Sequence, residues 1–230
     1  MHQENNSKRY AHKIDLASLL ENNDVLQKEF TSRKKLIKKG NYIYVPDDIS
    51  DRIYIIMDGK IKVGYYRDVD KEVVTAIFEK GNVFSEKTIL GEQKQKEFAI
   101  AVVDSELVSF LQTELDQLLK IHTDLNLLMM QMMGDRMVEM ESRLESLVFL
   151  DSKSRIIDFI IKSIEKSGQR IGYEWVLRNF LTHQDIASLT STSRQSVTMV
   201  LNDLRNDNII HFDRRRLLIR DLDKLKNLLK

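Results

Sequence analysis

The chain has 230 residues, of which 42% are hydrophobic and 31% are charged, and its formal net charge is +1. This length has room for about two domains of roughly 100–200 residues, and the balanced charge means that any contact with nucleic acid must come from a local basic patch. The sequence contains no cysteine, which excludes disulfides, thiol catalysis and cysteine-ligated metal or iron–sulfur sites.

Signals for membrane insertion or secretion are missing from the sequence. No window approaches the roughly 18 apolar residues of a membrane span. The polar amino terminus also lacks the apolar stretch of a signal peptide. We therefore expect a cytoplasmic protein that has no membrane partner.

The amino-terminal part of the chain is predicted to pass from a short helical segment into a run of strands. Residues 1–12 are polar and are expected to be disordered, and 14–30 have the spacing of one or two short helices. From 33 to 110, runs rich in β-branched and aromatic residues alternate with turn signals, which predicts an antiparallel sandwich or barrel. Asp58-Gly59 predicts a hairpin between two of these runs, because such a turn needs positive φ. The runs are 42–45, 53–57, 61–66, 73–78, 98–103 and 107–111.

A long helix is predicted from 115 to 150, where neither proline nor a glycine cluster interrupts the chain. Six of its apolar residues follow one another at spacings of 3, 4, 3, 4 and 3, the heptad pattern of two helices packed along their length. We interpret this seam as the contact between two copies of the chain. The alternative, a helix packed on its own sheet, would show a wider apolar stripe. The seam residues are Met130, Met133, Met137, Met140, Leu144 and Leu147.

Two short helices around a hydroxyl-rich turn are predicted within 182–204, after an amphipathic helix over 151–166 and an extended stretch over 173–177. Thr182 with Asp185, and Thr192 with Gln195, match the capping-box pattern. The second helix presents hydrogen-bonding side chains on its outer face, as a recognition helix does in the major groove. The alternative is an αα-hairpin that never binds DNA.

A hairpin of the kind called a wing is predicted after this segment, with short apolar strands at 209–212 and 217–219 around a charged turn. Arg214, Arg215 and Arg216 form its tip, where they are well placed for DNA phosphates. From Arg178 to Lys230 there are 10 Lys and Arg against 6 Asp and Glu, a local balance of +4. The basic charge therefore lies where a DNA-binding hypothesis requires it.

The order of these elements, together with motifs in register from 36 to 219, resembles the Crp/Fnr superfamily of bacterial transcription regulators. The resemblance implies an α+β fold with three parts: an antiparallel, jelly-roll-like β-roll sensor domain over 13–114, a dimerisation helix over 115–150, and a winged helix-turn-helix DNA-binding domain over 151–230. The motifs that carry it are Gly40, Gly59 and Gly81, Phe84-Ser85-Glu86, Asp104-Ser105-Glu106, Phe149-Leu150-Asp151 and Ser193-Arg194-Gln195-Ser196-Val197.

The chain departs from this family at the effector site. Members that bind cyclic AMP resemble one another in a Gly-Glu pair, which binds the ribose, and a later Arg-Ser pair, which neutralises the phosphate. Here Ser85 replaces the glycine, and the Arg-Ser pair falls on Gln95-Lys96 or Lys96-Glu97. Lys96 lacks the bidentate fork of arginine. A cyclic nucleotide is therefore not expected. The predicted pocket for an unidentified effector is Phe84, Glu86, Lys96, Met140 and Glu141.

Other cofactors of the family are not expected either. Iron–sulfur sensing requires cysteines, and the histidines of this chain do not pair at metal-ligand spacing, so we expect neither haem nor another metal site. The histidines are His2, His12, His122, His183 and His211.

The resemblance also implies which residues contact DNA. The family's reading triad of Arg, Glu and Arg corresponds to Arg194, Gln195 and Met199. Arg194 can bind guanine through O6 and N7, and Gln195 suits adenine unless it serves as a helix cap. Thr198 and Met199 are predicted to contact thymine methyls. Ser191 stands where the family often has glycine, which costs about 1 kcal/mol if φ is positive there. The predicted phosphate contacts are Thr182, Ser193, Ser196, Arg214, Arg215 and Arg216.

The sequence thus predicts a homodimeric, sequence-specific regulator whose partners are double-stranded DNA, a second copy of the chain and RNA polymerase. The alternative is an effector-sensing module whose carboxy-terminal domain binds a protein instead of DNA, against which the basic wing argues. We find no nucleophile–base constellation, phosphate-cradling glycine loop or metal-ligand cluster in the sequence, so an enzyme is not expected.

Overall fold

The computed structural model describes residues 16–67, 72–178, 180–213 and 216–229. The disorder expected over 1–12 and the wing residues Arg214 and Arg215 therefore lie outside the described residues. The described chain forms two compact units, one within Met1–Val63 and Ile77–Glu139, the other within Gly64–Ala76 and Met140–Lys230. The domain boundaries placed at 114/115 and 150/151 stay a prediction.

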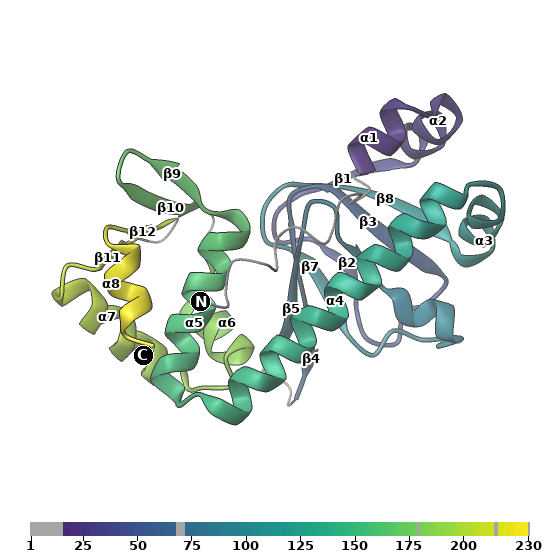
Figure 1. Cartoon of the computed structure of the whole chain (residues 1–230). Coiled ribbons are helices and arrows are strands. Elements are labelled where there is room, and N and C mark those ends of the chain that lie inside the picture. The colour runs from purple at the N-terminus through teal and green to yellow at the C-terminus, as the bar shows by residue number, and fades with distance from the viewer. Residues whose placement is uncertain (1–15, 68–71, 179, 214–215, 230) are drawn as a thin grey trace. The chain divides into compact units, whose positions relative to one another are not determined.

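Two four-stranded antiparallel sheets form the β-roll, which confirms the predicted fold class (Figure 1). One sheet has the order β1 (Lys34–Ile37), β8 (Ser105–Leu111), β3 (Arg52–Asp58), β6 (Val83–Phe84). The other has the order β2 (Tyr42–Tyr44), β7 (Phe98–Ala101), β4 (Lys60–Tyr66), β5 (Glu72–Glu79). Strands β1 and β6 were not predicted, because the first has two lysines followed by only two apolar residues and the second is very short.

Helices α1 (Leu16–Glu21) and α2 (Asp24–Ser32) precede the roll and close one part of its core. Phe30 of α2 is fully buried and packs against Phe110 of β8, with ring centroids 5.1 Å apart. Alternate residues of β3 face the same core: Ile53 and Ile55 are buried in it, and Met57 packs against it. The period-two pattern of the sequence therefore places its apolar face inward.

Gly59 makes a turn that changes sheets, and the predicted hairpin at Asp58-Gly59 is wrong. Strand β3 pairs with β6 and β8, whereas β4 pairs with β5 and β7. The φ of Gly59 is positive, as expected, at +106°. A Cβ at this position would lie 2.2 Å from Oγ of Ser105, whose hydroxyl accepts a hydrogen bond from the Lys60 amide. Positive φ marks the turn correctly, but it does not distinguish a hairpin from a crossing between sheets.

Gly59→Ala is expected to destabilise the roll by about 3 kcal/mol, because left-handed strain and overpacking act together. Gly81→Ala is the matched control, since Gly81 also has positive φ, +83°, but open space where the Cβ would be. That control should cost about 1 kcal/mol. Urea unfolding followed by circular dichroism measures both. Equal losses for the two variants would contradict the close approach of Ser105.

Two helices stand where one continuous helix was predicted over 115–150. Helix α3 (Gln112–Ile121) is followed by His122, whose extended backbone (φ −113°, ψ 92°) interrupts the helix before α4 (Thr123–Phe149) begins. The His122 ring lies 3.4 Å from the side-chain amide of Asn23, which caps α2. The prediction of a single helix was wrong at its start because no glycine or proline marks the break.

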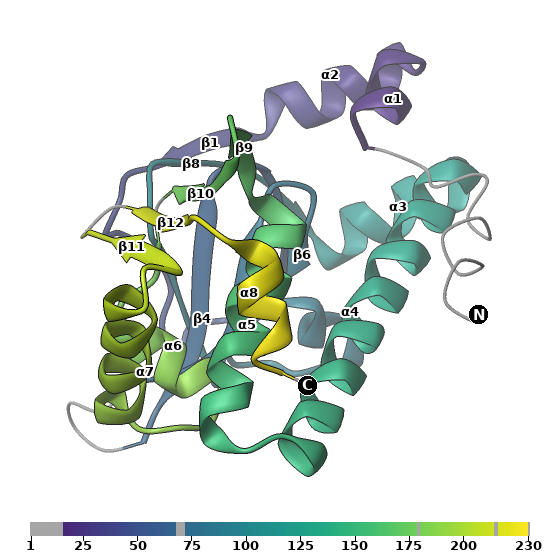
Figure 2. The same ribbon diagram turned by 60° about the vertical axis from the view of Figure 1, so that its left-hand side comes forward.

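The second unit contains the helix-turn-helix. Helix α5 (Ser152–Ser167) supplies five buried isoleucines to a core shared with α6 (His183–Leu189) and α7 (Arg194–Asn206). Its sheet has the order β11 (Ile210–Phe212), β12 (Arg216–Ile219), β10 (Glu174–Arg178), β9 (Gln169–Ile171). Helix α8 (Leu222–Asn227) packs on α5 (Figure 2). The wing is thus part of a sheet, with β12 paired to both β11 and β10.

Candidate nucleic-acid interface

Helix α6 begins at a complete capping box, as predicted for Thr182 and Asp185. The Asp185 amide donates to Thr182 Oγ1 over 3.1 Å, and the Thr182 amide donates to Asp185 Oδ2 over 3.2 Å. The Thr182 hydroxyl also donates to that carboxylate over 2.7 Å. Two of the amides that a helix start leaves unpaired are satisfied in this way.

The turn between the helices is made of four hydroxyl residues, and its cap is not the predicted one. Ser193 is the N-cap of α7 and accepts a hydrogen bond from the Ser196 amide over 2.9 Å. The proposed capping box of Thr192 with Gln195 is therefore wrong. Gln195 is the second residue of the helix rather than the third, so it does not lie at the capping position, and its side chain is exposed.

Ser191 occupies the left-handed region with φ +52°, which is the condition anticipated for the position where a glycine would fit. The turn is held by short hydrogen bonds of its own. The Thr190 hydroxyl donates to the Ile186 carbonyl over 2.7 Å and lies 2.9 Å from the Thr192 hydroxyl. These local hydrogen bonds help to maintain a backbone conformation that serine adopts at a cost.

The outer face of α7 carries the predicted base-reading residues. Arg194, Gln195 and Met199 are exposed, whereas Thr198 is half-buried. The Thr198 hydroxyl donates to the Arg194 carbonyl over 2.9 Å and lies 2.9 Å from Nδ1 of His183. Burial, and to a smaller extent the nearby charge of Arg194, lowers the pKa of His183. The lowered pKa favours the neutral imidazole, and this ring joins α6 to α7.

At the wing, Arg216 is the described member of the predicted arginine trio. Its guanidinium Nε lies 2.9 Å from Asp213 Oδ2, and its amide donates to the same carboxylate. Nearby, the guanidinium of Arg205 lies over the ring of Phe212, 5.1 Å from the centroid. Both ends of the pair between Arg216 and Asp213 are exposed, so the arginine can exchange this partner for a phosphate at little cost.

The predicted seam lies along α4 as an apolar stripe facing solvent. Met137 and Leu144 are 64% and 63% exposed, and a contiguous row of exposed apolar side chains is typical of a protein–protein interaction site. Met133 departs from the pattern, because it is half-buried against the core of the roll. Val138 and Val148, outside the heptad positions, are exposed as well. The exposed seam residues are Met130, Met137, Met140, Leu144 and Leu147.

Inside the roll, Glu86 forms an ion pair with Arg136 of α4. Both side chains are partly buried, and the guanidinium of Arg136 lies 4.8 Å from the centroid of the Phe78 ring. Phe84, also predicted for this pocket, is buried and stacks on Tyr54 and Phe78. The sequence analysis missed Arg136, because its pairing with Glu86 joins distant segments and no local motif marks it.

A chain of buried hydrogen bonds fills the part of the roll where the cyclic AMP-binding members have their phosphate cassette. The Gln95 side-chain amide donates to Ser85 Oγ over 2.8 Å, and Thr88 Oγ1 lies 2.8 Å from Ser50 Oγ and 3.4 Å from Ser85 Oγ. Lys96, predicted for the pocket, is exposed and pairs with Glu92. Met140 and Glu141 belong to the other compact unit, and their part in an effector pocket stays a prediction.

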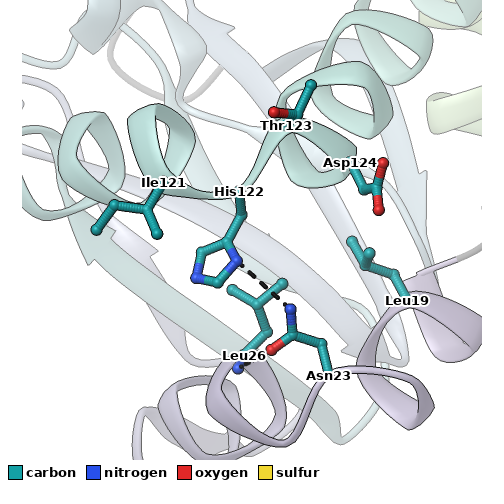
Figure 3. Close-up of a pocket in the computed structure, with 7 residues that line it drawn as sticks. All are labelled: Leu19, Asn23, Leu26, Ile121, His122, Thr123 and Asp124. Carbon is teal, nitrogen blue, oxygen red and sulfur yellow. Dashed lines mark hydrogen bonds between the residues drawn. The ribbon is translucent and has the colours of Figure 1, made fainter.

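A separate cavity of about 220 Å³ lies between α1–α2 and the break at His122 (Figure 3). The Asn23 and His122 side chains meet in it, and none of the residues predicted for the effector pocket lines it. In the described part of the chain, no three histidine or acidic side chains are placed to hold a metal ion. The described helices also include none with the length and apolar character that a bilayer crossing requires.

A β-roll of the sensor type, followed by a long helix and a helix-turn-helix with exposed polar side chains on its second helix and a basic wing, is the architecture of a DNA-binding transcription regulator. The family model for the Crp-like helix-turn-helix domain matches residues 154–228, and the cyclic nucleotide-binding domain model matches 34–122. Together these matches cover more than half of the chain. The protein belongs to the Crp/Fnr family of DNA-binding transcription regulators.

Curated relatives agree with this assignment. The global nitrogen regulator of Synechocystis sp. is 28% identical over 183 residues, which are 79% of this chain and 81% of that protein. The CRP-like cAMP-activated global transcriptional regulator of Mycobacterium tuberculosis is 22% identical over 187 residues, 81% of this chain and 84% of that protein. Because the relatives are transcription regulators, the alternative of a protein-binding carboxy-terminal domain is not favoured.

Solved structures support the fold. A CooA variant from Carboxydothermus hydrogenoformans has a TM-score of 0.77 at 24% identity, covering 95% of this chain and 97% of that one. A CRP/FNR-family transcriptional regulator from Thermus thermophilus has a TM-score of 0.69 at 24% identity, covering 85% and 97%.

Proposed function

We propose that the protein is a cytoplasmic, non-catalytic homodimer that binds a twofold-symmetric operator and engages RNA polymerase there. One α7 helix enters each of two major grooves about one helical turn apart. Arg194 and Gln195 read base edges, and Met199 and the Thr198 methyl contact thymine methyls. The observation that carries this proposal is the exposed Arg194–Gln195 pair at the start of α7, where neither side chain serves as the helix cap.

Phosphate contacts flank these base contacts. Ser193 and Ser196 lie at the start of α7 and Thr182 at the start of α6, where helix amides favour anions. The three hydroxyls are bonded within their caps, so they would accept phosphate only as an additional partner. Arg214, Arg215 and Arg216 provide the charge at the wing.

Arg216→Ala tests the phosphate contacts. The affinity should fall for every duplex, and the slope of log K against log[salt] should decrease in magnitude by about 1. Fluorescence anisotropy over a series of salt concentrations measures both quantities. Arg170→Ala is the matched control, because the exposed Arg170 lies on β9 and bonds to the Gly172 carbonyl. An unchanged slope in Arg216→Ala, or a salt-insensitive wild type, would contradict the proposed phosphate contacts.

The residues of the roll do not fit a cyclic nucleotide. Its phosphate needs a cation at the cassette, where Gln95 is buried in neutral hydrogen bonds and Lys96 is turned to solvent. Glu86, the candidate for the ribose, is already paired with Arg136. We therefore propose that cyclic AMP is not the effector, that the chain has no haem or iron–sulfur cofactor, and that any effector is of another chemical class.

Titration of the full-length protein with cyclic AMP should give no binding heat, whereas the cAMP-activated relative from Mycobacterium tuberculosis should respond under the same conditions. A phosphate placed beside Ser85 and Gln95 would lose its hydration without gaining a cationic partner, which is unfavourable. Isothermal calorimetry makes the comparison, with an operator-binding assay as the functional counterpart. Saturable micromolar binding of cyclic AMP, or tighter DNA binding in its presence, would contradict the proposal.

A further inference from the structure

One guanidinium joins the end of α4 to the turn of the helix-turn-helix. Nη1 of Arg155 donates to the Leu150 carbonyl, just beyond α4, over 2.9 Å. Its Nε donates to the Thr190 carbonyl over 2.9 Å, and its Nη2 to the Ser191 carbonyl over 3.2 Å. Leu150, Arg155 and the turn all belong to the second compact unit.

The acceptors explain why an arginine stands here. Leu150 and Thr190 follow the last residues of α4 and α6, where a helix leaves carbonyl groups without amide partners. The helix dipole also favours a cation at such an end. Arginine holds its donors in a rigid plane and can serve three carbonyls in fixed directions, whereas the ammonium of lysine is a point charge.

The carbonyls that Arg155 holds belong to the strained part of the turn. Ser191, with φ +52°, is followed closely by Ser193, the N-cap of α7, and by Arg194, the first residue of that helix. A change in the turn therefore moves the start of α7, and with it the residue that we expect to bind guanine. From α4 itself, Arg143 Nη2 reaches the Ser188 carbonyl of α6 over 3.3 Å.

The geometry points to Arg155 as a positioning residue for DNA recognition. It fixes the orientation of the recognition helix relative to the end of the dimerisation helix, and it touches no DNA itself. This inference rests on the proposed base contacts of α7. Through this one planar side chain and the main-chain carbonyls that it binds, the end of α4 sets the orientation of the outer face of α7.

Two variants test the inference. Arg155→Gln removes the positive charge and some of the N–H donors of the guanidinium. Arg155→Lys keeps the positive charge but loses the planar arrangement of the donors. Each is compared with wild type and with Arg170→Gln, a loss of charge elsewhere in the same unit. The probes are a duplex selected from a randomised library by the wild-type protein and a random duplex of equal length. Circular dichroism and the melting temperature verify that each variant is folded.

Both Arg155 variants should bind the selected duplex roughly tenfold more weakly, the equivalent of about one charge-assisted hydrogen bond. Binding to the random duplex and the salt slope should not change, because no phosphate contact is lost. Full activity of Arg155→Lys would overturn the inference, since charge alone would then suffice. Equal losses on both duplexes would overturn it too. A wild type that selects no duplex would instead refute the proposed base contacts.

A distance measurement reports the position of α7 without reference to affinity. The chain has no cysteine, so Glu145→Cys on α4 and Asp203→Cys on α7, both exposed, can be spin-labelled without competing thiols. Dilution of labelled protein with an excess of unlabelled protein restricts the signal to pairs within one protomer. Double electron–electron resonance should give one narrow distance in the wild-type background and a broader distribution with Arg155→Gln. Equal widths in the two backgrounds would overturn the inference.

Discussion

Arg194→Ala is expected to remove the discrimination at one base position of each half-site while leaving the protein folded and DNA-bound. An arginine paired with guanine O6 and N7 contributes about 1–3 kcal/mol of discrimination against the wrong base. The affinity for a selected operator should therefore fall by about tenfold to a hundredfold. The affinity for a random duplex should fall only slightly, because the variant has one positive charge fewer. Arg194 is exposed, so stability should not account for the loss.

Fluorescence anisotropy with the selected duplex, and with duplexes that replace each guanine in turn, measures this expectation. The guanine that Arg194 reads is the position whose replacement no longer matters in the variant. Arg170→Ala serves as the control for the loss of one positive charge in the same unit. If Arg194→Ala lost affinity equally for selected and random duplexes, the residue would be a phosphate contact and the proposed reading role would be wrong.

Leu144→Glu is expected to convert the protein into a monomer and to weaken operator binding by roughly a hundredfold or more, because each recognition helix would then bind alone. The substitution places a charge in the carboxy-terminal half of the seam, where Leu144 is 63% exposed in the single chain. A buried, unpaired carboxylate in a helix–helix contact is strongly unfavourable. The monomer itself should remain folded, since Leu144 contributes nothing to either core cluster.

Sedimentation velocity gives the oligomeric state, and anisotropy with a twofold-symmetric duplex gives the affinity. Glu145→Gln is the matched control, because it changes the charge of α4 by one unit outside the seam. A Leu144→Glu variant that stayed dimeric would show that another surface joins the two copies. A monomer with undiminished affinity for the symmetric duplex would instead contradict simultaneous binding of the two half-sites.

Periodicity in the sequence was sufficient to predict most of the strands and helices in their order, and the resemblance to the Crp/Fnr superfamily supplied the fold class. The β-strands of the roll and the helices α5, α6 and α7 have apolar residues at the spacing of the face that they bury. The partners of the strands could not be predicted in the same way. Asp58-Gly59 has the composition of a hairpin turn, and only the strand partners in the folded chain distinguish the crossing between sheets that it makes.

The candidate site shows the same division between local and distant signals. The capping box of Thr182 is a local pattern and is confirmed, whereas four hydroxyl residues in succession made the second cap ambiguous, and Ser193 rather than Thr192 holds it. Arg136 and Arg155 were missed because Arg136 pairs with the distant Glu86 and Arg155 binds the distant carbonyls of Thr190 and Ser191. A main-chain carbonyl, such as those of Leu150 and Thr190, has no signature in the sequence at all.

The crossing at Gly59 also has a consequence for the order in which the chain folds. Strand β3 does not pair with its neighbour β4 in the sequence but with β8. The pair of Tyr54 and Ser109 can therefore form only after the long chain segment between them has closed into a loop. In the second unit, by contrast, His211 of β11 pairs with Leu218 of β12 across a short turn. Folding slows as the sequence separation of contacts grows. We therefore expect the DNA-binding end of the chain to acquire its structure sooner than the sensor end, although it is synthesised last.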